Sequence, residues 1–382
     1  MGNDPTNAVQ TRLNDYVNSQ PSRHIGVVAG IISPDVPNSQ TLLFAGGDNL
    51  WNTQYKPLKL DGDTPFEIGS ITKVFTSQGW YSREQSYDDF KLGQFITAVE
   101  LPETLYDLKI RELANYSPGF PTDNRGGWWP PSVTQSLPNL LDFLKDPPTK
   151  LPQNTPGTCY SYSNFGWGLL ALASLGVSTY SDDVVQAWTK LMSEVTSAIG
   201  ISANTAPYNA SMDASLPVGY RHDGTILPLD HNYAPTGAML MGAGYLVSTG
   251  NDMMKWLGFN MGLQGVHPEF YLQQQPIWSR PPCPPNHSEK PPIVSLGWFH
   301  HVQSVYGAEL EYLAKDGGVA GFTSWMGFQS WIDAEEPSSI GCFVLTNSHG
   351  ASSLGETIMK LLLGVPNPVV VPVEPDYVPP AE

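Results

Sequence analysis

Ser70 and Lys73 stand three positions apart in a stretch, residues 70–82, whose apolar pattern predicts a helix. Residues at this spacing share one helix face, so the serine hydroxyl and the lysine amine can meet. A serine hydroxyl is a poor nucleophile until a base takes its proton, and a lysine held neutral can be that base. Ser70 also begins the helix, where free backbone N–H groups favour a developing negative charge. The pair therefore predicts nucleophilic catalysis, with Gly69 leaving room for a substrate.

The Ser-x-x-Lys pattern is weak by itself, because about one such pair is expected by chance in a chain of this kind. The alternative interpretation is an ordinary amphipathic helix with an exposed lysine. In this chain Ser70 and Lys73 form the only such pair, so its neighbours in the sequence decide between the two interpretations.

Tyr162 and Asn164 form a second motif, Tyr-Ser-Asn. A tyrosine can accept or donate a proton when nearby cations alter its pKa, and an asparagine amide can bridge a lysine and a substrate carbonyl. Alone, the motif is equally typical of a loop or a helix cap.

Lys315, Asp316, Gly317 and Gly318 form a third motif after a predicted strand over residues 309–314. A lysine followed by paired glycines on an edge strand presents a cation and a backbone N–H to a bound carboxylate or oxyanion. Taken alone, the same residues indicate a simple turn.

The elements that must position these motifs follow from apolar periodicity. It predicts an N-terminal helix over residues 6–18, a hairpin of strands 25–33 and 41–45, and helical stretches at 110–113, 140–144 and 184–199. Strand patterns return at 297–302, 309–314, 323–332 and 339–346, which indicates an antiparallel meander, and a closing helix follows at 354–363.

Strands early and late with helices between them predict an α+β fold, an antiparallel sheet flanked by the N- and C-terminal helices. We assign residues 1–83 to the first part of the sheet domain, 84–235 to an inserted, mainly helical region, and 236–365 to the second part of the sheet domain. Residues 366–382 are rich in proline and predict an extended tail. The motifs are expected in a cleft between the two parts.

With the three motifs in this order, the chain resembles the serine β-lactamase and penicillin-binding-protein superfamily over about residues 25–363. It looks closest to class C β-lactamases and their esterase and D-amino-acid peptidase relatives. Residues 112–121, 242–253 and 321–325 resemble family segments that accompany the motifs.

The resemblance implies a role for each motif residue. Ser70 would be acylated, Lys73 would assist proton removal, and Tyr162 would pass the proton to the leaving group. Asn164 would orient Lys73, and the N–H groups of Ser70 and Gly318 would form the oxyanion hole. Lys315 would support Tyr162 and bind a substrate carboxylate. No cofactor or metal is implied.

Two departures from the family pattern bear on the substrate. Asp316 stands where class C β-lactamases usually carry threonine, and its carboxylate would repel the acidic groups of penicillins and cephalosporins. Ser117-Pro118-Gly119 likewise replaces Ser-Gly. Aromatic residues near the motifs predict either an apolar cleft for an acyl or peptide group or ordinary core packing: Trp128, Trp129, Tyr233, Tyr245 and Trp325.

Charge and composition limit the kinds of partner that the chain is expected to bind. A net charge of -17 disfavours nucleic acid, and no apolar run is long enough to span a membrane. Without a leader pattern the chain is expected to be cytoplasmic, or extracytoplasmic if a leader has been removed. Cys159, Cys283 and Cys342 follow no zinc-ligand spacing but leave room for one disulfide, and His300, His301 and His349 form no metal triad.

Three functions are therefore open. The first is hydrolysis of an amide or ester through a Ser70 acyl-enzyme, on a D-amino-acid peptide or small ester, with weak β-lactam turnover conceivable. The second is an acyltransferase or peptide cyclase in natural-product biosynthesis. The third is a sensor or scaffold that keeps the fold without turnover. The partner expected in each case is a small molecule or peptide, and the sequence leaves the oligomeric state open.

Overall fold

The computed structural model describes residues 4–47, 50–123, 127–181, 183–202, 204–227, 239–265, 267–277, 280–283, 292–305, 307–319, 321–329 and 338–365. The predicted Pro-rich tail lies outside these residues, as do Tyr233 and most of the loop around Cys283.

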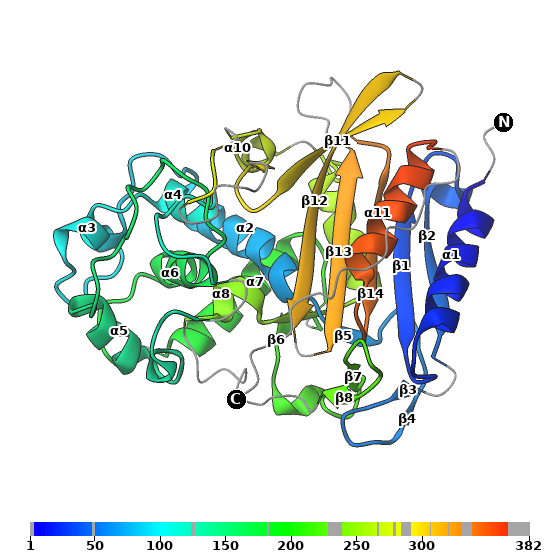
Figure 1. Ribbon diagram of the computed structural model, residues 1–382, viewed down its shortest axis with the longest axis horizontal. Helices are drawn as coiled ribbons and strands as arrows, with labels where there is room; N and C mark the ends of the chain where they lie inside the picture. Colours follow the sequence, from blue (N-terminus) through cyan, green and yellow to red (C-terminus); the bar gives the residue numbers. More distant parts are fainter. Residues whose placement is uncertain are drawn as a thin grey trace.

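One seven-stranded antiparallel sheet organises the molecule, in the order β10-β11-β12-β13-β14-β1-β2 (Figure 1). Its strands are β1 (Gly26–Ile32), β2 (Gln40–Gly46), β10 (Ile293–Val294), β11 (Phe299–Val305), β12 (Ala308–Val319), β13 (Phe322–Gln329) and β14 (Gly341–Thr346). The predicted hairpin and meander are therefore confirmed. β1 pairs with β14, so both ends of the chain build one sheet as predicted.

Short strands make three smaller sheets, β3-β4, β5-β9-β6 and β7-β8. Their bounds are β3 (Leu50–Trp51), β4 (Pro57–Leu58), β5 (Pro65–Glu67), β6 (Ala206–Pro207), β7 (Gly219–Tyr220), β8 (Ile226–Leu227) and β9 (Leu246–Thr249). None of these was predicted, because two to four residues carry no readable alternation. β5 matters for the site, since it leads directly into the segment that holds Ser70.

Helices cover both faces of the large sheet (Figure 1). α1 (Thr6–Ser19) and α11 (Ala351–Leu362) pack together on one face, over the apolar side chains of β1, β13 and β14. The other helices are α2 (Thr72–Glu84), α3 (Glu103–Tyr106), α4 (Ile110–Ala114), α5 (Leu137–Lys145), α6 (Asn164–Leu175), α7 (Val184–Ala198), α8 (Met241–Gly244), α9 (Gly250–Asn260) and α10 (Pro268–Gln274). The predicted α+β class is confirmed, whereas the boundaries at residues 83 and 235 stay a prediction.

α2 is the central helix of the larger core. Residues 72–80 are all buried, and α6, α7 and α8 pack around them. The predicted helix over 70–82 is therefore present, but it begins as a single 3-10 turn, Gly69–Ile71, and its buried surface is not limited to one side. The alternative of an amphipathic helix with an exposed lysine is wrong, because Lys73 is fully buried.

Candidate active site

Ser70 lies in the 3-10 turn between β5 and α2, and its hydroxyl contacts two proton-carrying groups. Lys73 Nζ and the Tyr162 hydroxyl each donate to Ser70 Oγ at 2.8 Å. The lysine stands one turn along the same helix, as its spacing predicts. The tyrosine comes from a distant segment, so the fold assembles this trio.

Lys73 Nζ has three hydrogen-bond partners, as many as a charged ammonium group has donors. Besides Ser70 Oγ, its Nζ lies 2.7 Å from Asn164 Oδ1 and 2.7 Å from the carbonyl oxygen of Ala243. Burial, and next the charge of Lys315, hold the pKa of Lys73 well below its usual value. A neutral amine keeps two N–H groups for Asn164 and Ala243, which leaves its lone pair directed at the serine hydroxyl.

Ala243 was missed by the sequence analysis, although it belongs to the Gly-rich segment that the resemblance included. It lies in α8, which is held against α2 by a hydrogen bond of 2.7 Å from Thr76 Oγ1 to the Gly242 carbonyl. A backbone carbonyl carries no side-chain signature, so no residue type at position 243 would have pointed to this contact.

Tyr162 is kept in its protonated form. Burial and the carboxylate of Asp316 raise the pKa of Tyr162 well above its usual value. Two lysine nitrogens approach the ring, Lys73 Nζ at 4.9 Å and Lys315 Nζ at 5.4 Å from its centroid, and Tyr116 stacks against it at 5.5 Å. The phenol is thus fixed in place and serves as a donor to Ser70.

Asn164 begins α6, and Ser163 caps that helix by accepting from Gly166 N at 3.1 Å. The interpretation of Tyr-Ser-Asn as a helix cap is therefore correct, and its interpretation as a catalytic motif stays a prediction. The helix itself was not predicted, because its residues are almost uniformly apolar and lack a 3.6-residue period.

Asp123 supports the start of α6 and was also missed. Its buried carboxylate accepts from Asn164 N at 2.6 Å, Phe165 N at 2.9 Å and Ser163 Oγ at 3.1 Å. Burial raises the pKa of Asp123 to about 6, against the lowering effect of these hydrogen bonds and of the Lys73 charge. A lone aspartate in a loop gives no such indication from sequence.

β12 brings the third motif to the nucleophile. A methyl group placed on Gly69, whose φ is +48°, would lie only 2.5 Å from Gly318 N. One placed on Gly317 would lie 2.1 Å from the carbonyl oxygen of Ile68. The expectation that Gly69 leaves room for substrate is wrong, because the backbone of β12 fills that space. Gly318 itself is exposed beside Ser70.

Lys315 and Asp316 form an ion pair at the end of the site. Lys315 Nζ donates to Asp316 Oδ1 at 2.8 Å and to the Asp316 carbonyl oxygen at 2.7 Å. The Lys315 side chain is 0% exposed, whereas that of Asp316 is 61% exposed. Lys315 opposes the effect of burial and leaves the pKa of Asp316 below its usual value, so Asp316 is charged.

The aromatic residues divide between two locations. Trp325 is 2% exposed and packs with Tyr312 on the α1/α11 face of the sheet. Trp128 and Trp129 are half-buried against Phe165, and Tyr245 is buried in the larger core. Core packing, one of the two alternatives, therefore describes Trp325 and Tyr245.

One disulfide joins Cys159 to Cys283, and Cys342 is free and buried. Backbone hydrogen bonds reinforce the link: Tyr160 N donates to the Pro281 carbonyl at 2.9 Å, and Cys283 N donates to the Tyr160 carbonyl at 2.8 Å. The disulfide therefore anchors the segment that carries Tyr162, three residues further on.

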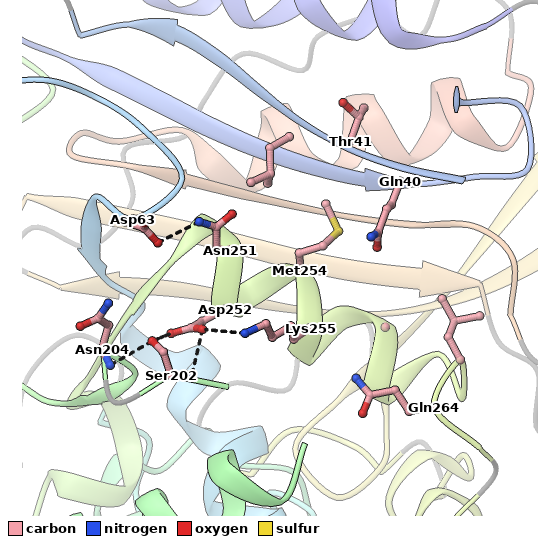
Figure 2. A pocket seen from close by; sticks show the side chains of 13 residues that line it. Gln40, Thr41, Asp63, Ser202, Asn204, Asn251, Asp252, Met254, Lys255 and Gln264 are labelled. Atoms are coloured by element: carbon pink, nitrogen blue, oxygen red, sulfur yellow. Dashed lines mark hydrogen bonds and ion pairs between the residues drawn. The ribbon is translucent and has the colours of Figure 1, made fainter. Parts of the chain in front are cut away.

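A polar groove of about 770 Å³ lies elsewhere, between β2 and α9 (Figure 2). Its acidic residues are already partnered: Asp63 accepts from Asn251 at 2.8 Å, and Asp252 accepts from Ser202 Oγ at 2.6 Å. None of the predicted site residues lines this groove. Its size alone does not make it the reaction site, because the nucleophile and base lie together at Ser70.

Within the described part of the chain, no group of three or more metal-ligating side chains occurs. Among the described helices, none combines the length and apolar character needed to cross a membrane.

The chain is similar to known proteins in its family pattern and in its fold. The family model described as β-lactamase matches residues 33–362. No curated protein sequence matches the chain significantly.

Solved structures share the fold. β-Lactamase/D-alanine carboxypeptidase from Pseudomonas syringae superposes with a TM-score of 0.69 at 17% identity, covering 95% of this chain and 99% of that one. D-alanine carboxypeptidase AmpC from Burkholderia cenocepacia gives 0.67 at 19% identity, covering 94% and 99%. A class C β-lactamase from Rhodobacter sphaeroides gives 0.66 at 18% identity, covering 94% and 98%.

Proposed function

The chain belongs to the β-lactamase family, and from that premise we propose that it is a serine hydrolase that forms an acyl-enzyme on Ser70. Its substrate class would be an amide or ester of a D-amino-acid peptide or small acyl compound, in keeping with the carboxypeptidases and β-lactamases that share the fold. The observation that carries the proposal is the position of Ser70 Oγ, 2.8 Å from both Lys73 Nζ and the Tyr162 hydroxyl.

Acylation begins with proton transfer from the Ser70 hydroxyl to the neutral amine of Lys73. Ser70 Oγ then bonds to the substrate carbonyl carbon, and the carbonyl oxygen takes the negative charge. The N–H groups of Ser70 and Gly318 stabilise that oxyanion, an interaction that contributes about 3–4 kcal/mol per donor in other acyl-transfer enzymes. The low pKa of Lys73 supports this base, because an ordinary lysine would already be protonated at neutral pH.

Collapse of the oxyanion breaks the bond to the leaving group. Tyr162 donates its proton to the departing nitrogen or oxygen and regains one from Lys73, so the protonation states of the site are restored. Its raised pKa supports the donor role, since a phenol that stays protonated has a proton to give. Water attacks the acyl-enzyme by the same path in reverse, and Ser70 is released with the carboxylic acid product.

A labelling experiment tests the proposal. A fluorophosphonate, which carries no carboxylate, should attach covalently to the wild-type protein at Ser70, with the modified residue identified by peptide mass spectrometry. Ser70→Ala should abolish labelling. Ser82→Ala, on the exposed side of the same helix, is the matched control and should label normally. Absence of a fluorophosphonate adduct on the wild-type protein would contradict the proposal, as would full labelling of Ser70→Ala.

Product analysis separates hydrolysis from acyl transfer. With a neutral ester as donor, the free acid should be the main product even when an amine acceptor is added. If the amide of that acceptor dominates instead, the enzyme transfers its acyl group to a nucleophile other than water, and the hydrolytic assignment is overturned.

A further inference from the structure

Lys315, the lysine that could bind a substrate anion in this site, already pairs with a side chain of the protein. Within the part of the chain that the structure describes, its Nζ donates to two acceptors, the carbonyl oxygen and Oδ1 of Asp316. The rings of Tyr162 and Phe299 flank the same ammonium, each with its centroid at 5.4 Å. A lysine ammonium has three donors, so little capacity is left for a substrate anion.

The ionisable groups named around the site carry a net negative charge when Lys73 is neutral, as its role as a base requires. Lys73 Nζ and Lys315 Nζ both approach the Tyr162 ring, and Lys315 is then the charged one of the two. Two carboxylates accompany this cation: Asp123, which is buried and accepts from Asn164 N, and Asp316, which pairs directly with Lys315.

Asp316 presents its carboxylate to solvent next to the candidate site. It lies two residues before Gly318, whose N–H approaches the turn that carries Ser70, and its side chain is largely exposed. A substrate carboxylate that came close to Asp316 would be repelled by it, and more strongly where protein replaces solvent.

We propose, on the basis of the function proposed above, that Asp316 is a specificity-determining residue that selects substrates without a carboxylate beside the bond to be cleaved. The favoured class is neutral or amine-bearing esters and amides. Free C-terminal carboxylates and the acidic groups of β-lactams are discriminated against, because Asp316 repels them and neutralises the lysine that would otherwise hold them.

A matched pair of substrates tests the proposal. The charged member is the thioester of benzoylated D-alanine with thioglycolic acid, whose leaving group carries a carboxylate. The neutral member is the same thioester with the carboxylate of its thioglycolate leaving group methylated. Wild-type kcat/KM should favour the neutral member by at least about tenfold, which corresponds to about 1.4 kcal/mol. Asp316→Asn should reduce that preference at least about fivefold by improving turnover of the charged member.

The control is Glu309→Gln, which removes one negative charge from an exposed position on the same strand. It should leave the preference unchanged. A second measurement does not depend on any variant: added salt screens a Coulombic preference, so the wild-type ratio should fall as ionic strength rises.

Outcomes for this inference and for the proposed function are distinguishable. If the neutral substrate is turned over through Ser70 but the charged one is equally good, and neither salt nor Asp316→Asn alters the ratio, the role of Asp316 is wrong. If neither substrate is turned over and Ser70 takes no probe, the proposed hydrolase itself fails.

Discussion

The carboxylate of Asp123 accepts a hydrogen bond of 2.6 Å from the backbone N–H of Asn164. Asn164 in turn accepts from Lys73 Nζ at 2.7 Å, so a buried acid is connected to the proposed base through one residue. Asp123 touches none of the reacting atoms, and we regard it as a positioning residue. It fixes the first turn of α6 and adds a negative charge near Lys73.

Asp123→Asn should lower kcat with little change in KM. The amide replaces one accepting oxygen by a donor, so the first turn of α6 must shift and Asn164 with it; displacements of about 1 Å can cost about 100-fold in rate. Steady-state kinetics on a neutral ester measures the effect, and Asp142→Asn at an exposed site is the control. A loss that appears only in KM would contradict a positioning role.

The pH dependence of Asp123→Asn gives a second readout. The Asp123 charge raises the pKa of Lys73, so its removal should move the acid limb of kcat/KM to lower pH. The protonation of Asp123 itself near pH 6 would also disappear from the profile. An acid limb that stays in place would argue that Asp123 is only structural.

The wild-type pH profile should be broad and extended toward high pH. Lys73 acts as a base only when neutral, so kcat/KM rises with pH through its lowered pKa and levels off well before the range in which an ordinary lysine loses its proton. Tyr162 has a raised pKa and keeps its proton, so no fall from this group is expected below pH of about 10. Rates that climb steadily to pH of about 10 would indicate an unperturbed lysine instead.

Lys73→Arg tests whether the group at this position must lose its proton. An arginine is not deprotonated in proteins, so it cannot take the Ser70 proton as a neutral lysine can. We expect kcat/KM to fall by about 100-fold to 10,000-fold at every pH, the usual contribution of a general base. Substantial activity that returns at high pH would mean that another group, such as Tyr162, serves as the base.

Gly69→Ala should damage both stability and activity, whereas Gly176→Ala should affect stability alone. Both glycines have positive φ, +48° and +67°, which costs an alanine about 1–2 kcal/mol. Only Gly69 meets a neighbour, Gly318 N at 2.5 Å; the space beside Gly176 is empty within 4 Å. Urea unfolding and ester kinetics measure the difference, and equal effects in the two variants would refute a close contact between the Ser70 turn and β12.

Removal of the disulfide should lower both unfolding stability and kcat. It closes a loop of 124 residues, for which chain entropy gives about 4–5 kcal/mol as an upper figure. The Cys159→Ser/Cys283→Ser double variant also frees the loop segment before Tyr162. Reductant should lower the unfolding midpoint of the wild type and leave that of the double variant unchanged. Equal midpoints for wild type and variant without reductant would contradict this.

The motifs of the candidate site could be found in the sequence because their geometry is local or because they occur in the order of the family pattern. Ser70 and Lys73 depend on one helical turn, and the strands around Lys315 on simple alternation. Three contacts could not be predicted, because each joins residues far apart in the sequence. Asp123 and Ala243 bind their partners through backbone groups, which carry no side-chain signal. The third contact is the Cys159–Cys283 disulfide, and three cysteines leave the choice of pair open.

Burial also escaped prediction from sequence. Thr72, Ser77 and Gln78 are polar, yet they lie in the centre of the core because helices surround α2 on several sides. A polar residue on a helix normally indicates solvent. Here Thr72 Oγ1 accepts from Leu246 N at 3.1 Å and the Ser77 hydroxyl bonds the Tyr87 hydroxyl at 2.6 Å, so internal partners replace water.

The position of β1 beside β14 has a consequence for how the enzyme is made. Gly26 N donates to Asn347 Oδ1, which lies 321 positions later in the chain. β14, which pairs with both β13 and β1, joins the strands that carry Gly318 to the N-terminal hairpin, so a nascent chain on the ribosome carries Ser70 long before this sheet can close. The two sides of the candidate site can therefore meet in their final arrangement only when nearly the whole chain has been synthesised.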